Sequence, residues 1–232
     1  MTPIQAIIAV VIIIALINII LFFMSKSEVK LSSMQSGMIP LNILSSSIPI
    51  PLSSSNYTYS SWFYINQWSS DGNKVIMQHL NVDADPSPKI SLGATQNNLT
   101  IQQACVVSGN SIAIHKCEVK NIPIQKWVNL LISVNGRSLD VYIDGKLVRT
   151  CVLPGQIKND GAEKPIEITP AGKGFHGWTS NFKYWNTSTN PSEAHKIYKA
   201  GYGGSVLGNL FNKYRLKVAF VKDGVETNSL HF

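Results

Sequence analysis

The sequence has little cysteine, little charge and only one long uncharged stretch, and each scarcity excludes a class of protein. Three cysteines in 232 residues exclude a disulfide-dense miniprotein. Charged residues make up only 14% of the chain and hydrophobic residues 44%, which excludes a disordered polar chain, and its 16 glycines exclude a collagen. A single uncharged stretch excludes a multispanning membrane protein. The length leaves room for one domain of roughly 150–200 residues and one further segment.

Motifs of catalysis and of metal binding are also missing. No Glu-x-Asp-x-x-Glu strand brings two carboxylates to within about 5 Å of each other, as a retaining glucanase requires. The nearest pair, Asp140 and Asp144, shares a strand face, but Asp144 belongs to an Asp-Gly turn, so the pair is interpreted as structural. The five histidines show no paired spacing, and His115 with Cys117 lacks a second pair of zinc ligands. We therefore predict a protein that is not an enzyme and binds no zinc.

The one long apolar stretch lies at the N-terminus. Residues 1–25 carry no charged side chain, and the run from 4 to 24 is interrupted only by Gln5 and Asn18. As a helix this run would be about 31 Å long, which matches a hydrocarbon core of roughly 30 Å. A cleaved signal peptide is disfavoured because no Lys or Arg precedes the apolar core. We predict an uncleaved transmembrane anchor over residues 1–25, whose lipid-facing residues include Ile4, Ile8, Val11, Ile14, Ile17, Leu21 and Phe22.

The charges and the sequons disagree about the side of the membrane on which the rest of the chain lies. Lys26 and Lys30 follow the span, so the positive-inside tendency favours the cytosolic side. Three Asn-x-Ser/Thr sequons, at Asn56, Asn98 and Asn186, favour the opposite side. Such triplets arise often by chance in a chain rich in Ser, Asn and Thr. The cytosolic side is therefore expected, with glycosylation of the sequons left open.

Beyond the anchor the pattern indicates an all-β protein. Residues 26–56 are Ser-rich and punctuated by prolines, which is typical of an extended tether that can donate an edge strand. From residue 57 apolar and polar residues alternate, and turn signals recur every eight to twelve residues. Strands are predicted at 57–65, 74–79, 89–92, 99–107, 111–118, 127–134, 138–143, 146–152, 166–168 and 178–185. We predict an antiparallel jelly-roll sandwich over 57–201 and a basic extension with one returning strand over 202–232.

Three local signals are the clearest. Asn135-Gly136 and Asp144-Gly145 lie between alternating strands and predict type I′ hairpins, hence an antiparallel meander. Asn190, Pro191 and Glu193 stand at the cap, first and third positions of a short helix that ends at Gly201.

The three cysteines leave two possibilities open, one disulfide or none. A hairpin turning at 108–110 would pair Cys105 with residue 113, so a bridge from Cys105 to Cys117 does not follow. A disulfide between Cys117 and Cys151 remains open, because their strands could be neighbours in one sheet. Three buried free thiols are the alternative.

Three segments together resemble the laminin-G-like, concanavalin-A-like jelly-roll superfamily. They are YTYSSWFYI (57–65), WVNLLISVNGRSLDVYIDGKLV (127–148) and GFHGWTSNFKYWNTSTNPSEAHKIYKAG (174–201). The resemblance implies a concanavalin-A-like sandwich, in a superfamily that includes glucanases, lectins, calcium-dependent adhesion modules and structural domains. It also makes Asp83 and Asp85 candidate calcium ligands, with a polar loop tip as the alternative; no other cofactor is expected.

A narrower resemblance combines the anchor with GNLFNKYRLKVAFVKDGVE (208–226). Both are similar to membrane-anchored proteins of large icosahedral DNA viruses of algae. This implies a minor capsid protein that links an internal virion membrane to the shell, with the bilayer and other capsid or membrane proteins as partners. The alternative is a membrane-tethered, lectin-like adhesion module with a glycan partner. Such a module would expose Trp68 or Trp178 beside polar groups, whereas a structural module would bury them.

Positive charge is concentrated in the last third of the chain. Between Lys164 and Lys222 there are nine Lys or Arg and two acids. These cations either protect sheet edges or dock anionic partners. Nucleic acid is not expected, because the cations alternate with core-facing residues and leave no stacking platform. The predicted docking surface consists of Lys183, Lys196, Lys199, Lys213, Arg215 and Lys217.

Overall fold

The computed structural model describes residues 12, 16, 28–70, 72–203, 217–222 and 225–231, the last two ranges by their backbone alone. Within this described part of the chain, no helix is long and apolar enough to span a bilayer. The seven lipid-facing residues predicted for the anchor lie outside the described residues. The transmembrane anchor therefore stays a prediction from the sequence.

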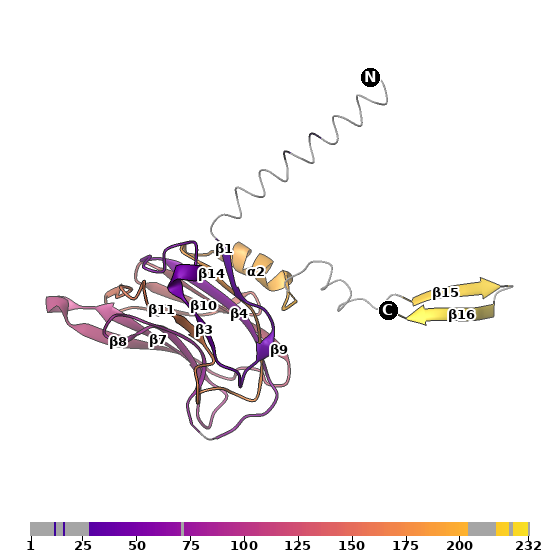
Figure 1. The fold of residues 1–232 in the computed structure, drawn as a ribbon, viewed down its shortest axis with the longest axis horizontal. Helices are drawn as coiled ribbons and strands as arrows, with labels where there is room; N and C mark the ends of the chain where they lie inside the picture. Colours follow the sequence, from indigo (N-terminus) through magenta and orange to yellow (C-terminus); the bar gives the residue numbers. More distant parts are fainter. Residues whose placement is uncertain are drawn as a thin grey trace.

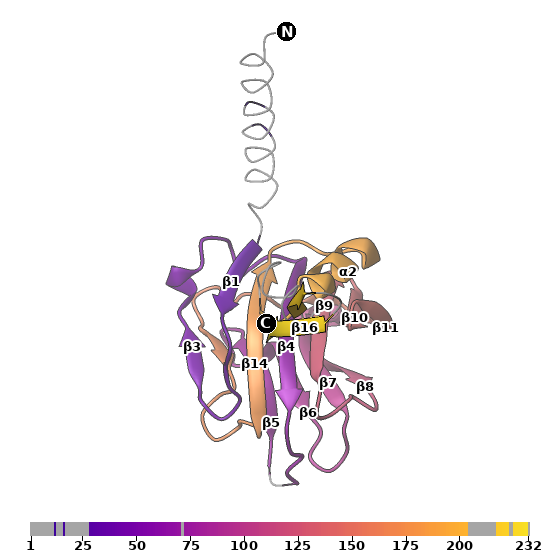
Figure 2. The ribbon, with the colours of Figure 1, turned by 90° about the vertical axis from the view of Figure 1, so that its right-hand side faces the viewer.

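The fold is a sandwich of two antiparallel sheets, each with seven strands (Figures 1 and 2). Sheet 1 has the order β1-β14-β4-β9-β10-β11, with β2 also paired to β14. Its strands are β1 (Glu28–Ser32), β2 (Gln35–Ser36), β4 (Tyr57–Ile65), β9 (Trp127–Asn135), β10 (Ser138–Ile143), β11 (Lys146–Val152) and β14 (Gly177–Trp185).

Sheet 2 has the order β12-β7-β6-β5-β13-β3, with β8 paired to β7. Its strands are β3 (Leu41–Ile43), β5 (Lys74–Leu80), β6 (Pro86–Leu92), β7 (Leu99–Val106), β8 (Ile112–Val119), β12 (Gln156–Ile157) and β13 (Ile166–Ile168). Short 3₁₀ turns span Ser45–Ser47 and Ser108–Asn110, and the helix α2 spans Pro191–Lys199. The strand β15 (Lys217–Lys222) pairs with β16 (Val225–His231).

Period-two alternation builds the core between the sheets. Val128, Leu130, Ile132 and Val134 of β9 are all fully buried and belong to one continuous cluster that takes side chains from both sheets. Every strand predicted over 57–185 is present, with ends that differ by three residues at most. The all-β antiparallel sandwich is thus confirmed. The stretch predicted as a tether joins the sandwich at three places, because β1 and β2 pair with β14 and β3 pairs with β13.

The two predicted hairpin turns differ from each other. Asp144 and Gly145 both have positive φ, at 50° and 72°, as a type I′ turn requires. The other two-residue loop is Gly136-Arg137, one residue later than predicted, and only Gly136 has a positive φ, at 57°. A glycine at the first loop position is typical of a type II′ turn, which also matches the strand twist.

The predicted helix forms and packs on the outer face of sheet 1. The Asn190 side chain accepts a hydrogen bond from the Glu193 N–H at 3.0 Å, while the Glu193 carboxylate accepts one from the Thr189 hydroxyl. Gly201 follows the helix with a φ of 73°, as a helix-ending glycine does. Ala194 is buried against Leu131 and Tyr142, the outward-facing residues of β9 and β10. The central strands of sheet 1 are therefore covered on both faces.

Cys117 and Cys151 form a disulfide, but not between neighbours in one sheet. Cys117 lies on β8 at the edge of sheet 2, and Cys151 lies on β11 at the edge of sheet 1. The bond thus joins the two layers at one open side of the sandwich. The assumption of a shared sheet was wrong because two facing edge strands come as close as paired ones, here with Cα atoms 6.0 Å apart. The Cys105 thiol is buried and forms no disulfide. In the strand register Cys105 lies opposite Ala113, as the hairpin predicted.

We expect the double variant Cys117→Ala/Cys151→Ala to unfold with a free energy lower by about 3 kcal/mol, because it loses the constraint on a loop closed over 34 residues. Urea unfolding with and without reductant measures this difference. Reductant should destabilise the wild-type protein and the Cys105→Ala control but not the double variant. An equal effect of reductant on all three proteins would contradict the assignment.

A buried histidine, His79, lies on β5 in sheet 2. His79 on β5 is 1% exposed, and its ring nitrogens lie 3.2 Å from the Ser87 carbonyl oxygen and 2.9 Å from that of Gly161. Burial lowers the pKa of His79, and the backbone carbonyls only partly oppose that effect. The folded protein therefore keeps His79 neutral at pH values at which an unfolded chain would protonate it.

This difference predicts acid sensitivity with a defined sign. The unfolded chain takes up a proton on His79 below about pH 6.5, whereas the folded protein does not, so stability is full above that pH and falls as the pH is lowered toward the depressed folded pKa. Urea midpoints measured from pH 8 to pH 5 should fall for the wild type and for His115→Gln. The slope should flatten for His79→Gln, and an unchanged slope in that variant would show that His79 is not the responsible group.

Candidate binding sites at the two ends of the sandwich

Strand register gives the sandwich two distinct ends. At the end where β1 begins, Glu28 lies opposite Trp185, which lies opposite Thr58. We call this the entry end. At the other end, the far end, Tyr64 lies opposite both Trp178 and Trp127, and the loop from β4 to β5 leaves the sheet there. In Figure 2 β1 and α2 lie toward the top, and the loop before β5 hangs at the bottom.

A polar pocket of about 580 Å³ opens among the far-end loops. It combines one tryptophan with amides from the loop that joins β6 to β7 and from the loop that follows β8. The lining residues of this far-end pocket are Trp68, Thr95, Gln96, Asn97, Asn98, Lys120, Asn121 and Ile124. Three loops that are far apart in the sequence thus meet at one opening.

Trp68 is held in place from two sides. Its indole N–H donates to the Ala94 carbonyl oxygen at 3.2 Å, and the Lys74 ammonium lies 5.2 Å from the ring centroid. Lys74 is almost completely buried and donates to the carbonyl oxygens of Ser69 and Ala94. A cation so fixed over an indole stabilises the ring position. The tryptophan therefore lines the pocket as a rigid aromatic wall.

The amides of the pocket are partly fixed and partly free. Asn97 donates to the Ile122 carbonyl oxygen, and Asn98 donates to both Gln96 and Glu118 at 3.0 Å. Asn98 is only 8% exposed, so its amide nitrogen is not presented for glycosylation in the folded domain. The exposed Asn121 has a positive φ of 58° and turns its loop at the rim. The pocket thus offers both hydrogen-bond donors and acceptors beside an aromatic wall.

An aromatic groove of about 480 Å³ lies on the outer face of sheet 1, near the far end. It is lined by Met34, Tyr64, Trp127, Trp178 and Tyr202. The register aligns Trp178, Tyr64 and Trp127 in one row across three strands, and Trp178 is 49% exposed. The Tyr202 ring stacks on Trp127 with centroids 4.7 Å apart. This groove is more apolar than the far-end pocket and contains no charged residue.

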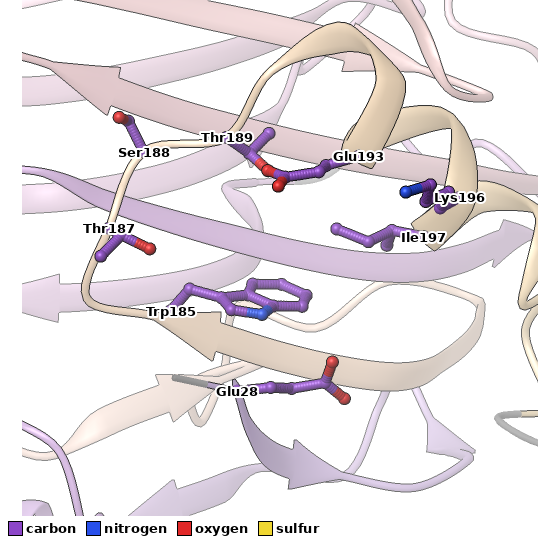
Figure 3. Close-up of a pocket in the computed structure, with 8 residues that line it drawn as sticks. All are labelled: Glu28, Trp185, Thr187, Ser188, Thr189, Glu193, Lys196 and Ile197. Atoms are coloured by element: carbon purple, nitrogen blue, oxygen red, sulfur yellow. The ribbon is translucent and has the colours of Figure 1, made fainter. Parts of the chain in front are cut away.

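A third hollow, the entry pocket, has a volume of about 310 Å³ and lies at the entry end (Figure 3). It is formed by the first residue of β1, the end of β14, the loop that follows, and α2. Its lining residues are Glu28, Trp185, Thr187, Ser188, Thr189, Glu193, Lys196 and Ile197. Among them, only Lys196 was predicted from the sequence as a binding residue, and Glu193 was predicted only as part of the helix cap. The polar run from Asn186 to Asn190, between a strand and a capped helix, was the available signal.

The predicted calcium ligands have a lysine as their partner. Lys158 forms ion pairs with Asp83 and with Asp160, the latter at 3.6 Å. The Asn81 side chain donates a hydrogen bond to the Asp85 carboxylate and accepts one from the Asp85 backbone N–H. The aspartates, with Asp83 in direct hydrogen-bond contact, raise the pKa of Lys158. Within the described ranges, no cluster of three His, Cys, Asp or Glu is arranged for a metal ion.

The predicted basic docking surface is only partly assembled. Lys183 does not serve as a free cation, because it pairs with Glu28 at 2.6 Å and its side chain is 15% exposed. Lys196 and Lys199 are exposed on α2. Lys213 and Arg215 lie outside the described residues, and Lys217 begins β15, which is described by its backbone alone.

The carboxylates once considered for catalysis have structural partners. Asp140 accepts a hydrogen bond from the Thr150 hydroxyl at 2.6 Å. Asp144 accepts from the Asn129 N–H at 2.9 Å and pairs with Lys126 at 3.0 Å. Both side chains therefore fix the turn and the sheet edge around them.

Comparison with known proteins identifies the domain and its relatives in fold. The family model of the concanavalin A-like lectin/glucanases superfamily matches residues 42–195, which is more than half of the chain. No curated protein matches the sequence at a significant level. The three solved structures described next are each less than 25% identical to this chain, so they show a similarity of fold alone.

Three of these structures illustrate the range. Domain 4 of AbnA, a GH43 extracellular arabinanase from Geobacillus stearothermophilus, in complex with arabinotriose, is 18% identical, with 71% of this chain and 75% of that chain covered and a TM-score of 0.53. The binding domain of botulinum neurotoxin DC, in complex with rat synaptotagmin II, is 14% identical, with 72% and 42% covered and a TM-score of 0.51. The serotype G binding domain is 13% identical, with 74% and 50% covered and a TM-score of 0.50. The chain thus spans half or less of the length of these neurotoxin chains.

We expect Lys158→Met to give the protein a weak calcium affinity, because it removes the ammonium that pairs with Asp83 and Asp160 and leaves both carboxylates without that cation. Calcium at millimolar concentration should raise the melting temperature of this variant and leave the wild type unchanged, since a ligand stabilises only the state that binds it. Differential scanning fluorimetry with calcium or a chelator measures the effect. A wild-type protein that is itself destabilised by the chelator would show that the aspartates hold a metal after all.

Proposed function

Because the chain belongs to the concanavalin A-like lectin/glucanases superfamily, we propose that it is a non-enzymatic, membrane-tethered module that binds carbohydrate. The observation that carries this proposal is the far-end pocket, where the fixed Trp68 stands beside several amides. From the sequence, a lectin was expected to expose Trp68 or Trp178 beside polar groups. A structural module was expected to bury both side chains. Trp178 is half exposed and Trp68 lines the pocket, so the geometry favours the lectin-like function.

The chemistry of the far-end pocket suits a sugar ring. A sugar presents an apolar face of C–H groups that packs on an aromatic ring, and hydroxyl groups at its edges. Trp68 supplies the ring, while Gln96, Asn97 and Asn121 supply amide groups that both donate and accept hydrogen bonds. The similarity in fold to an arabinanase domain solved with arabinotriose is consistent with a glycan ligand. The absence of a free carboxylate pair around this pocket supports binding without hydrolysis.

The proposed tether and the proposed site lie at opposite ends of the domain. Residue 28 begins β1 at the entry end, directly after the predicted anchor, whereas Trp68 lies beyond the end of β4. The far-end pocket would then point away from the membrane. The disulfide between Cys117 and Cys151 favours an oxidising compartment, and we propose the non-cytosolic side for the domain, against the expectation from Lys26 and Lys30.

A second function is favoured by a different surface. The aromatic groove combines tryptophan, tyrosine and methionine, which are the residues enriched at protein interfaces. It supports a minor capsid protein that joins an internal virion membrane to the capsid shell, with shell proteins docking on Trp178. The viral resemblance of the anchor and of residues 208–226 supports the same function. The domain would then face the capsid on the cytosolic side.

One pair of variants separates the two functions. On a glycan array, we expect Trp68→Ala to abolish binding, a loss of at least about 2 kcal/mol for a stacked aromatic anchor, and Trp178→Ala to retain it. Both variants should stay folded, but Trp68→Ala should lose more in melting temperature than Trp178→Ala, because the Trp68 ring packs partly against the core and faces Lys74 whereas Trp178 is half exposed. Absence of any glycan signal, together with association with virus particles that is lost in Trp178→Ala, would overturn the lectin-like function in favour of the capsid function.

A further inference from the structure

We propose that the entry pocket binds the zwitterionic headgroup of a phospholipid, an inference that rests on the membrane tether of the proposed function. The pocket is polar, it lies beside the residue at which the chain enters the domain, and it combines carboxylates, an aromatic ring and a lysine (Figure 3). A zwitterionic headgroup carries an ammonium and a phosphate a short distance apart. Carboxylates and an aromatic ring bind the ammonium, and a lysine binds the phosphate.

The position of the pocket matches the depth of the headgroup layer. The predicted apolar span ends at Met24, and Glu28 lines the pocket four residues later. Four residues of extended chain reach about 14 Å at most. The headgroup layer on each side of the hydrocarbon core is about 5–8 Å thick. A pocket at Glu28 is therefore within reach of headgroups in the membrane that holds the anchor.

One side of the pocket suits an ammonium group. The Glu28 carboxylate gives one oxygen to Lys183, and Glu193 gives one oxygen to the Thr189 hydroxyl, so each keeps its second oxygen for a ligand. Figure 3 shows the Trp185 indole between the Glu28 side chain and α2. An ammonium over an indole face gains from the ring quadrupole, and quaternary ammonium ligands use this contact most. The carboxylates add direct charge complementarity.

The other side of the pocket suits a phosphate group. Lys196 is exposed, and no carboxylate of the described residues lies within ion-pair distance of its ammonium. The hydroxyl-bearing residues Thr187 and Ser188 line the same hollow in the loop before α2. A lysine and hydroxyl donors together bind a phosphate through charge-assisted hydrogen bonds.

The charges of the pocket also state what it rejects. Glu28 forms an ion pair with Lys183, whereas Glu193 and Lys196 line the same hollow without pairing with each other. A headgroup that carries a phosphate but no ammonium would leave the second oxygens of Glu28 and Glu193 without a cationic partner. The pocket therefore selects a zwitterionic headgroup, in contrast to the anionic partner predicted for a surface of lysines that included Lys183 and Lys196.

The test uses the full-length protein labelled with fluorotryptophan, with the Trp185 fluorine resonance assigned from Trp185→Phe. In maltoside micelles, glycerophosphocholine should shift this resonance to saturation, and glycerophosphoglycerol should not. Glu193→Gln and Lys196→Met should each weaken binding about tenfold, as expected for one lost charge-assisted contact. Lys199→Met, on the same helix but outside the pocket, is the matched control and should bind as the wild type does.

Nanodiscs distinguish the headgroup of a membrane lipid from a soluble zwitterionic phosphodiester such as glycerophosphocholine. In phosphatidylcholine nanodiscs the Trp185 resonance should lie at the bound position without added ligand, and in phosphatidylglycerol nanodiscs at the free position. Equal positions in both lipids, no shift with glycerophosphocholine, or a protein that does not stay in the nanodisc would each overturn the proposal. Trp68→Ala should leave the Trp185 shift intact, so the loss of glycan binding and the loss of headgroup binding are separate results.

Discussion

The packing of α2 on the outer face of sheet 1 is the contact on which two of the candidate sites, the entry pocket and the aromatic groove, depend. Ala194 fills the space over Leu131 and Tyr142, and the Trp62 and Tyr198 rings stack with centroids 5.6 Å apart. This contact fixes the helix face that lines the entry pocket. It also places Tyr202, three residues beyond the end of the helix, on the aromatic row at the far end. Without the helix, sheet 1 would expose a broad apolar face and neither hollow would have its second wall.

Local signals in the sequence predicted most of the fold. Period-two alternation located the strands from 57 to 185, and the Asp144-Gly145 turn and the Asn190 cap formed as their residue types require. Each of these signals is decided within a few neighbouring residues. Residues 26–56 were expected to donate an edge strand, but the positions of β1, β2 and β3 were not predicted because short edge strands obtain their stability from pairing partners more than a hundred residues away, such as β14 and β13.

The candidate sites were harder to predict because each is assembled from distant segments. Trp68 was named as a glycan-binding aromatic, yet nothing in the sequence places Asn97 and Asn121 beside it. Lys158 lies more than seventy residues from Asp83, so a search for calcium ligands had no reason to include the cation that pairs with them. The disulfide was named with the right partners and the wrong sheets. Sequence spacing defines faces and turns, but it does not define which edges of two layers meet.

The two edges of sheet 1 have unequal mechanical roles. At one edge β11 is bonded covalently to the other layer through Cys151. At the opposite edge β1 is held by noncovalent contacts: its ladder to β14, the Glu28–Lys183 ion pair and the packing of Val29 and Leu31 against the core. Tension applied through the residues before Glu28 would shear this short ladder along the strand direction and would not reach the disulfide. Under such tension a tethered domain would lose its first strand, β1, before any other. The remaining strands of the sandwich would stay packed.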